Sequence, residues 1–222
     1  MRLVNLTLDS YNILIGILLF ISISLRHVVN TKVKLGFQSI VIMNIAMAAT
    51  HVVSLIFQGS TNPASLIIFQ ISVFVFYLLS FTVLVASGVE IMFYLNLEKY
   101  RKAFLAIAAV FLGIYCVLLV LTPFSGLLYV IDENNTLVHG NLYNFYLGFQ
   151  LVLYFNTVFY LLLNNKSINK EHITFLVSFM LFPQLMQFVQ IGVHGIALTN
   201  TGFTISFLKE KAIAINESYK RK

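Results

Sequence analysis

Long apolar runs recur along this chain, and they restrict its possible folds more than any other feature. The longest, residues 66–95, reads LIIFQISVFVFYLLSFTVLVASGVEIMFYL. About 20 apolar residues cross a bilayer as a helix, and a backbone surrounded by lipid must satisfy its own hydrogen bonds. Only 10% of the 222 residues are charged, whereas soluble domains carry about 25%. The sequence therefore predicts an all-α membrane protein with no room for a soluble domain.

We predict a bundle of seven membrane-spanning helices. The third apolar run exceeds one bilayer crossing, so its last turns are expected to leave the hydrocarbon. The seventh predicted span is the most polar, and its prediction rests mainly on the distribution of Lys and Arg described below. The spans cover residues 4–25, 36–57, 66–95, 103–122, 142–163, 173–191 and 193–208, and residues 209–222 form a charged linker or tail.

The positions of Lys and Arg predict the orientation of the bundle. Basic residues concentrate in the cytoplasmic loops of membrane proteins. Of the 14 Lys and Arg residues, all except Arg2 follow the first, third, fifth or seventh span. Without the seventh span, the basic residues of the tail would lie on the opposite side. The pattern predicts that the N-terminus is outside and the C-terminus is cytoplasmic.

One polar stretch, LLYVIDENNTLVHGNLY at residues 127–143, interrupts the apolar sequence between the fourth and fifth spans. DENN is a turn signal, and the apolar segments on either side have strand-like composition. In the predicted orientation this is the longest loop on the outer side. We expect a short extracellular β-hairpin that covers the outer end of the bundle.

Several classes of function find no support in the sequence. The net charge of +6 comes from loops between apolar runs, so it does not indicate nucleic-acid binding. Cys116 stands alone and supports neither a disulfide framework nor a metal motif. No nucleotide-binding loop or catalytic triad is evident, and the seventh span lacks a Lys that could hold retinal. We therefore predict no enzyme activity, no metal and no cofactor.

Polar side chains within the spans are the candidate ligand-binding residues. Polar groups in such helices face the bundle, because lipid cannot satisfy them. In the fifth span they recur every three or four residues, which places them on one helical face. Hydrogen bonding between helices, without a ligand, is the alternative interpretation. The candidates are His51, Gln70, Tyr143, Tyr146, Gln150, Gln187, Gln190 and His194.

Glu90 is an acidic residue near the predicted cytoplasmic end of the third span. A carboxylate within a membrane span is a candidate for function. Counting from Leu66 places Glu90 about one turn beyond the hydrocarbon, so solvation at the interface is the alternative. We take Glu90, Lys209 and Glu210 as candidates for signal transmission to the tail.

The segment TPFSGLLYVIDENNTLVHGNLYNFY resembles part of a known family. It is similar to the N-terminal seven-helix sensory regions of bacterial, especially clostridial, GGDEF diguanylate cyclases and related histidine-kinase sensors. Further similarity lies in SLRHVVNTK, KSINKEHITFLVSFMLFPQL and FLKEKAIAINESYKRK. His139 stands where the family usually has Arg, and Asn141 where it usually has Pro. The matching positions are Pro123, Phe124, Gly126, Asp132, Glu133, Asn134, Asn135, Gly140, Leu142 and Tyr143.

The resemblance implies a multi-pass sensor of the bacterial cytoplasmic membrane. Its output would be of the cyclic-di-GMP or kinase type, carried by a separate domain or by another protein. No cyclase domain is present in this sequence, so both a fragment and a stand-alone sensor remain open.

The leading hypothesis is a membrane sensor that passes a signal through its seventh helix and tail. Its expected partners are the lipid bilayer, a small-molecule or peptide signal and a cytoplasmic output protein, and a homodimer is left open. Two alternatives remain, namely a small-solute transporter and a membrane scaffold or assembly protein without a ligand.

Overall fold

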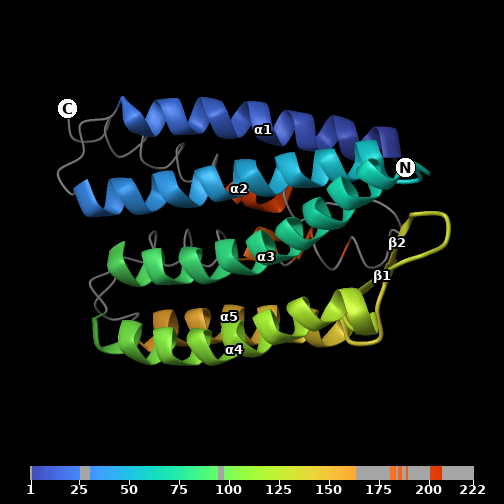
Figure 1. Ribbon diagram of the computed structural model, residues 1–222. Helices are drawn as coiled ribbons and strands as arrows, with labels where there is room; N and C mark the ends of the chain where they lie inside the picture. The colour runs from blue at the N-terminus through green and yellow to red at the C-terminus, as the bar shows by residue number, and fades with distance from the viewer. Residues whose placement is uncertain are drawn as a thin grey trace.

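The computed structural model describes residues 2–25, 31–94, 98–163, 181–183, 185–186, 189 and 201–206. Three helices, α1, α2 and α3, lie side by side, and α4 and α5 run along the opposite flank (Figure 1). We call the end that carries the two strands the hairpin end. The elements are α1 (Arg2–Ser24), α2 (Thr31–Phe57), α3 (Pro63–Tyr94), α4 (Glu98–Ser125), β1 (Tyr129–Ile131), β2 (Leu137–His139) and α5 (Tyr143–Leu163).

Four helices of the described part are long and apolar enough to cross a membrane. They cover Arg2–Ser24, Lys34–Phe57, Pro63–Phe93 and Tyr100–Ser125. Many large apolar side chains on them point away from the bundle, among them Leu14, Leu18 and Val117. Side chains of this kind exposed along a helix suit contact with lipid. The helices therefore indicate a membrane-associated protein.

Local sequence explains where several helices begin and end. The Asn62 side chain caps α3 by accepting a hydrogen bond from the Ala64 amide at 3.0 Å, and Pro63 follows at the first helical position, which Pro favours. Gly59 follows α2 with φ 81°, and Gly126 follows α4 with φ 65°. Such left-handed residues end helices, and Gly adopts them without strain.

Described helices occupy the sequence ranges of the first five predicted spans, but α5 is not among the four that are long and apolar enough to cross a membrane. The third prediction, 66–95, corresponds to α3 (Pro63–Tyr94), and the fifth, 142–163, to α5 (Tyr143–Leu163). The fourth, 103–122, is shorter than α4 (Glu98–Ser125), because the helix continues through Pro123 in its last turn. Most of the sixth and seventh predicted spans falls outside the described residues.

Glycine lets neighbouring backbones approach at several crossings. A Cβ at Gly16 of α1 would press on Ile45 of α2, and one at Gly88 of α3 on Phe104 of α4. Gly202 lies against the backbone of Pro183, so residues 181–183 and 201–206 pack on each other. Small residues at crossings drive helix association where there is no hydrophobic effect between helices. Among the helices that the structure describes, the most extensive packing joins α2 to α3.

Candidate functional site

The hairpin between α4 and α5 is held by its turn chemistry. Tyr129 pairs with His139 and Ile131 with Leu137 in an antiparallel register. Asp132 accepts hydrogen bonds from the Thr136 amide at 2.7 Å and its hydroxyl at 2.7 Å. These bonds, with those from Asn134, lower the pKa of the Asp132 carboxyl. The turn therefore favours an ionised Asp132.

The tip of the hairpin is bonded to the loop between α2 and α3. The Gly59 amide donates to the Asn135 carbonyl at 3.0 Å, and the Asn135 side chain donates to the Ser60 carbonyl at 2.6 Å. Asn135 has φ 55°, a left-handed conformation that Asn tolerates better than most residues. We call these two bonds the hairpin latch. The latch therefore bonds the connection between α4 and α5 to the loop between α2 and α3 at the same end of the bundle.

The base of the hairpin is fixed to α4. The Gly140 amide donates to the Leu128 carbonyl at 2.9 Å, and the Leu128 amide donates to the Thr122 hydroxyl at 3.3 Å. A Cβ at Gly140 would overlap the carbonyl oxygens of Gly126 and Leu127. The Gly in the sequence HGN is therefore required by a close approach of backbones.

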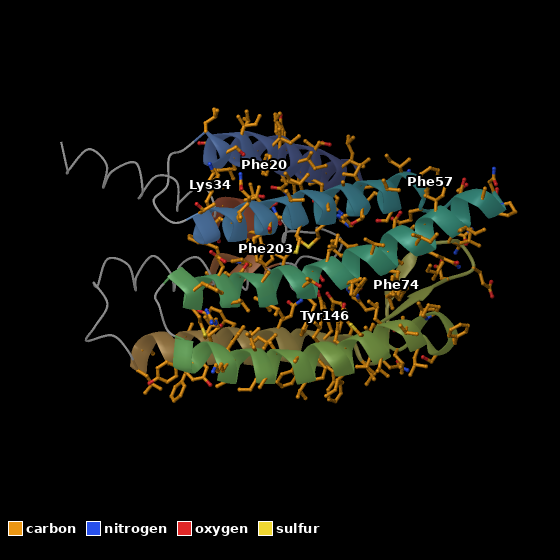
Figure 2. All side chains as sticks on the ribbon, turned by 60° about the vertical axis from the view of Figure 1, so that its left-hand side comes forward. Phe20, Lys34, Phe57, Phe74, Tyr146 and Phe203 are labelled. Atoms are coloured by element: carbon orange, nitrogen blue, oxygen red, sulfur yellow. The ribbon has the colours of Figure 1, made fainter. Side chains whose placement is uncertain are left out.

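Five tyrosines form a cluster under the hairpin. They come from α3, α4, β1 and α5, and Figure 2 shows Tyr146 between α3 and the α4–α5 flank. Ring centroids lie 5.0 Å apart for Tyr77 and Tyr129, and 5.4 Å for Tyr115 and Tyr146. Burial raises the pKa of the Tyr129 hydroxyl to about 12. The members of this tyrosine cluster are Tyr77, Tyr115, Tyr129, Tyr143 and Tyr146.

Hydrogen bonds fix two members of the tyrosine cluster in place. The hydroxyls of Tyr146 and Ser80 lie 2.6 Å apart, and the Tyr115 hydroxyl donates to the Tyr77 carbonyl at 2.8 Å. Tyr146 and Gln150 are both buried. Buried hydroxyls need such partners, because an unsatisfied one costs about 1–3 kcal/mol. The cluster joins β1 to three helices through packed and bonded side chains.

A groove of about 620 Å³ lies beside the tyrosine cluster, between α3, the end of α4 and strand β1. We call it the lateral groove. Tyr129 belongs both to its wall and to the tyrosine cluster. Figure 2 shows another wall residue, Phe74 of α3, near the hairpin. The wall consists of Gln70, Ile71, Phe74, residues 122–126 and residues 129–131.

A second polar group lies inside the bundle, between α1, α2 and residues 201–206. Asp9 of α1 is completely buried, and its Oδ2 lies 2.5 Å from Nδ1 of His51. The His51 ring stacks on Phe76 with centroids 4.8 Å apart. Charged residues within a membrane span are costly unless they are paired, so the pair explains how Asp9 is accommodated.

Amide side chains extend this group along α1 and α2. The Asn12 amide donates to the Thr201 hydroxyl at 3.1 Å, and the Asn44 amide donates to the Thr204 hydroxyl at 3.3 Å. The Asn44 Oδ1 is buried and finds no hydrogen-bond partner among the described residues. We call Asp9, Asn12, Asn44, His51, Thr201 and Thr204 the polar cluster. It links the first two helices to the segment just before the tail.

Glu90 is buried near the end of the bundle that lies away from the hairpin. It is 8% exposed, which favours a contact between helices over the alternative of a solvated carboxylate at the interface. Its oxygens occupy the space that a Cβ would fill at Gly36 of α2. Its Oε1 has no hydrogen-bond partner among the described residues. Glu90 therefore stands at the α2–α3 crossing, where it is sensitive to any shift between these helices.

The structure separates the predicted ligand-binding residues into different environments. Tyr143 and Tyr146 belong to the tyrosine cluster, and Gln150 is buried beside it. His51 is paired with Asp9 in the polar cluster. Gln70 is exposed and lines the lateral groove. The remaining predicted residues, Gln187, Gln190, His194, Lys209 and Glu210, lie outside the described residues.

The sequence did not single out Asp9 as a paired acid within the bundle. A signal was available, because Asn5, Asp9 and Asn12 recur at helical spacing and share the buried face of α1. Tyr77, Tyr115 and Tyr129 were also missed, since they lie in three different apolar segments. No spacing rule connects such residues before the fold is known.

Comparisons with known proteins add no relative. No protein-family model matches the chain, and neither the curated proteins nor the solved structures include a significantly similar one. Among the described residues, no three His, Cys, Asp or Glu side chains lie close enough together to hold a metal ion. The function must therefore be argued from the groove and the two buried groups.

Proposed function

We propose that this protein is a seven-helix membrane sensor that binds its signal at the hairpin end. The observation that carries the proposal is the double role of Tyr129, which lines the lateral groove and packs within the tyrosine cluster. A ligand that displaces Tyr129 would disturb side chains of α3, α4 and α5 together. Packed interiors respond to such displacements by small shifts of whole helices.

The proposed signal leaves the site through contacts between helices. The hairpin latch connects the hairpin to the α2–α3 loop, and the polar cluster connects α2 to residues 201–206. Residues 209–222 follow this segment in the sequence. Signalling requires that the ligand binds two arrangements of the bundle with different affinity. In the proposed orientation the hairpin is extracellular, and the tail meets a cytoplasmic output protein.

A disulfide across the hairpin latch tests this proposal without a known ligand. Ser60→Cys and Asn135→Cys are combined on a Cys116→Ala background, and the protein is reconstituted in liposomes. Hydrogen exchange of residues 201–222 is measured with the bridge oxidised and reduced. A sensor should show a changed exchange rate in this segment when the hairpin is fixed. Identical exchange in both states would count against transmission, and Ser60→Cys alone serves as the control.

The Asp9–His51 pair favours a second candidate, a transporter of small solutes that is driven by protons. Carboxylate and imidazole groups within spans are typical of proton relays. Transport would require uptake of a solute into proteoliposomes under a pH gradient. Loss of that uptake with His51→Gln, at unchanged protein insertion, would favour the transporter over the sensor.

A further inference from the structure

The lateral groove has a chemistry that narrows its ligand, and the argument rests on the sensor function proposed above. Its walls are mainly apolar, with Ile71 and Phe74 on α3 and Pro123 and Phe124 on α4. Its volume of about 620 Å³ lies within the range of roughly 300–1,000 Å³ found for small-molecule sites.

The groove opens sideways on the outer surface of two candidate membrane spans. Phe124 is 89% exposed, and Ile71 is 58% exposed. Both belong to helices that are long and apolar enough to cross a bilayer. In the proposed membrane protein these residues face lipid, so a ligand can enter from the membrane leaflet. The groove also reaches strand β1 and the end of α4, where the apolar span stops.

The polar groups on the described walls of the groove are uncharged. Among these described wall residues there is no Asp, Glu, Lys, Arg or His, so a charged head group would lose its hydration without gaining a partner there. The Ser125 hydroxyl donates its proton to the Leu121 carbonyl at 2.8 Å. The Thr122 hydroxyl is buried, donates to the Leu118 carbonyl at 2.7 Å and already accepts from the Leu128 amide at 3.3 Å. Of the two hydroxyl oxygens, the exposed one of Ser125 can therefore accept a hydrogen bond from a ligand.

Gln70 completes the polar edge on the α3 side of the groove. Its amide can both donate and accept. The Ser125 acceptor on α4 and the Gln70 amide on α3 together suit a head group that carries hydroxyls. We infer that the lateral groove binds an uncharged, hydroxyl-bearing amphiphile from the membrane leaflet, with its acyl chain against Ile71 and Phe74.

Photo-crosslinking tests the inference on the complete chain in phosphatidylcholine liposomes. The probe is a monoacylglycerol with a photoreactive group in its acyl chain. Matched probes carry the same chain on a free fatty acid or on phosphatidylcholine. We expect the monoacylglycerol to label peptides that contain residues 70–74 or 122–131, and unlabelled monoacylglycerol to compete. Equal labelling by the phosphatidylcholine probe would show ordinary lipid contact and overturn the inference.

Substitutions place the ligand within the groove. Ile71→Trp fills it and should lower labelling about tenfold, which corresponds to about 1.4 kcal/mol of affinity. Val117→Trp is the control. It adds the same side chain at an exposed position of α4 that does not line the groove, and it should leave labelling unchanged. Val130→Trp, on the hairpin wall, repeats the test if the first variant does not insert. Unchanged labelling in an inserted groove variant would overturn the inference.

The two proposals can fail separately. Labelling of the groove does not depend on any output from the tail. If the monoacylglycerol probe does not label the groove, the lipid inference fails, and the disulfide experiment still decides the sensor proposal. Conversely, a tail that does not respond to the hairpin, in a protein that binds monoacylglycerol in the groove, would leave a lipid-binding site without signalling.

Discussion

The Asp9 carboxylate is the most demanding single group in the described part of the bundle. It has no exposed surface, and His51 lies 2.5 Å away. Removing one partner of a buried pair costs about 3–5 kcal/mol, because a charge is left without compensation. We expect His51→Ala to lower the free energy of unfolding by about this amount in SDS titrations of mixed micelles.

A double-mutant cycle separates the pair from other effects at these positions. Asp9→Asn and His51→Ala should show a coupling of roughly 1–3 kcal/mol. Ser10→Ala, at an exposed position of α1, should change the free energy of unfolding by less than about 0.5 kcal/mol. Additive losses for Asp9→Asn and His51→Ala would contradict a direct interaction.

Gly36 and Glu90 provide the second prediction at the residue scale. A methyl group at position 36 would overlap the Glu90 carboxylate, so Gly36→Ala should destabilise the protein by about 1–3 kcal/mol. Glu90→Ala in the same chain should recover part of this loss by vacating the space. Gly113→Ala meets no atom within 4 Å and should be neutral or stabilising by up to about 1 kcal/mol. Equal losses at the two glycines would contradict the crowding.

At the scale of elements, the hairpin turn depends on the charge of Asp132. Its pKa is lowered from 3.8 by hydrogen bonds from Thr136 and Asn134. The ionised form therefore stabilises the turn above pH 3.8, and this contribution is lost as the pH falls through the lowered pKa. NMR titration of the Asp132 carboxyl should show a pKa below 3.8 that rises in Thr136→Val. An unchanged pKa in that variant would contradict the bonding.

Asn135 combines a side-chain bond with an unusual backbone conformation. Asn135→Gly keeps the φ of 55° accessible but loses the bond to Ser60, at a cost of about 1 kcal/mol. Asn135→Val adds backbone strain of about 1–3 kcal/mol. Amide exchange at Gly59 should therefore rise from wild type to Asn135→Gly to Asn135→Val. Glu133→Ala, in the exposed turn, is the control, and the reverse order of the two Asn135 variants would contradict the strain.

Helices were more predictable than side-chain partners. The third and fifth helices follow directly from apolar runs. For α3, a candidate membrane span, lipid would leave the backbone no alternative structure. The extra turns of α4 were missed, since apolar counting ends a span where charged residues or Pro begin, whereas the helix itself continues from Glu98 to Ser125. Asp9 and His51 are 42 residues apart in sequence. Their pairing depends on how α1 packs on α2, which the sequence alone does not specify.

At the scale of the whole molecule, the orientation of the bundle across the membrane is predicted from the charge pattern and not from the helices themselves. The four candidate spans have both ends described, but length and composition are the same in either direction. The basic residues predict the orientation, because those of short loops remain on the cytoplasmic side during insertion. The segment that follows α5 in the sequence contains Lys166 and Lys170, and residues 220–222 read KRK. Both segments should therefore face the cytoplasm, opposite the hairpin.

Cysteine accessibility tests this orientation and the number of spans together. On a Cys116→Ala background, Glu133→Cys in the hairpin should react with a membrane-impermeant maleimide in intact cells. Ser167→Cys and Ser218→Cys should react only after the membrane is permeabilised. Labelling of Ser218→Cys in intact cells, with Ser167→Cys protected, would mean that an even number of spans precedes the tail. That result would remove the seventh span and with it the proposed route from residues 201–206 to a cytoplasmic partner.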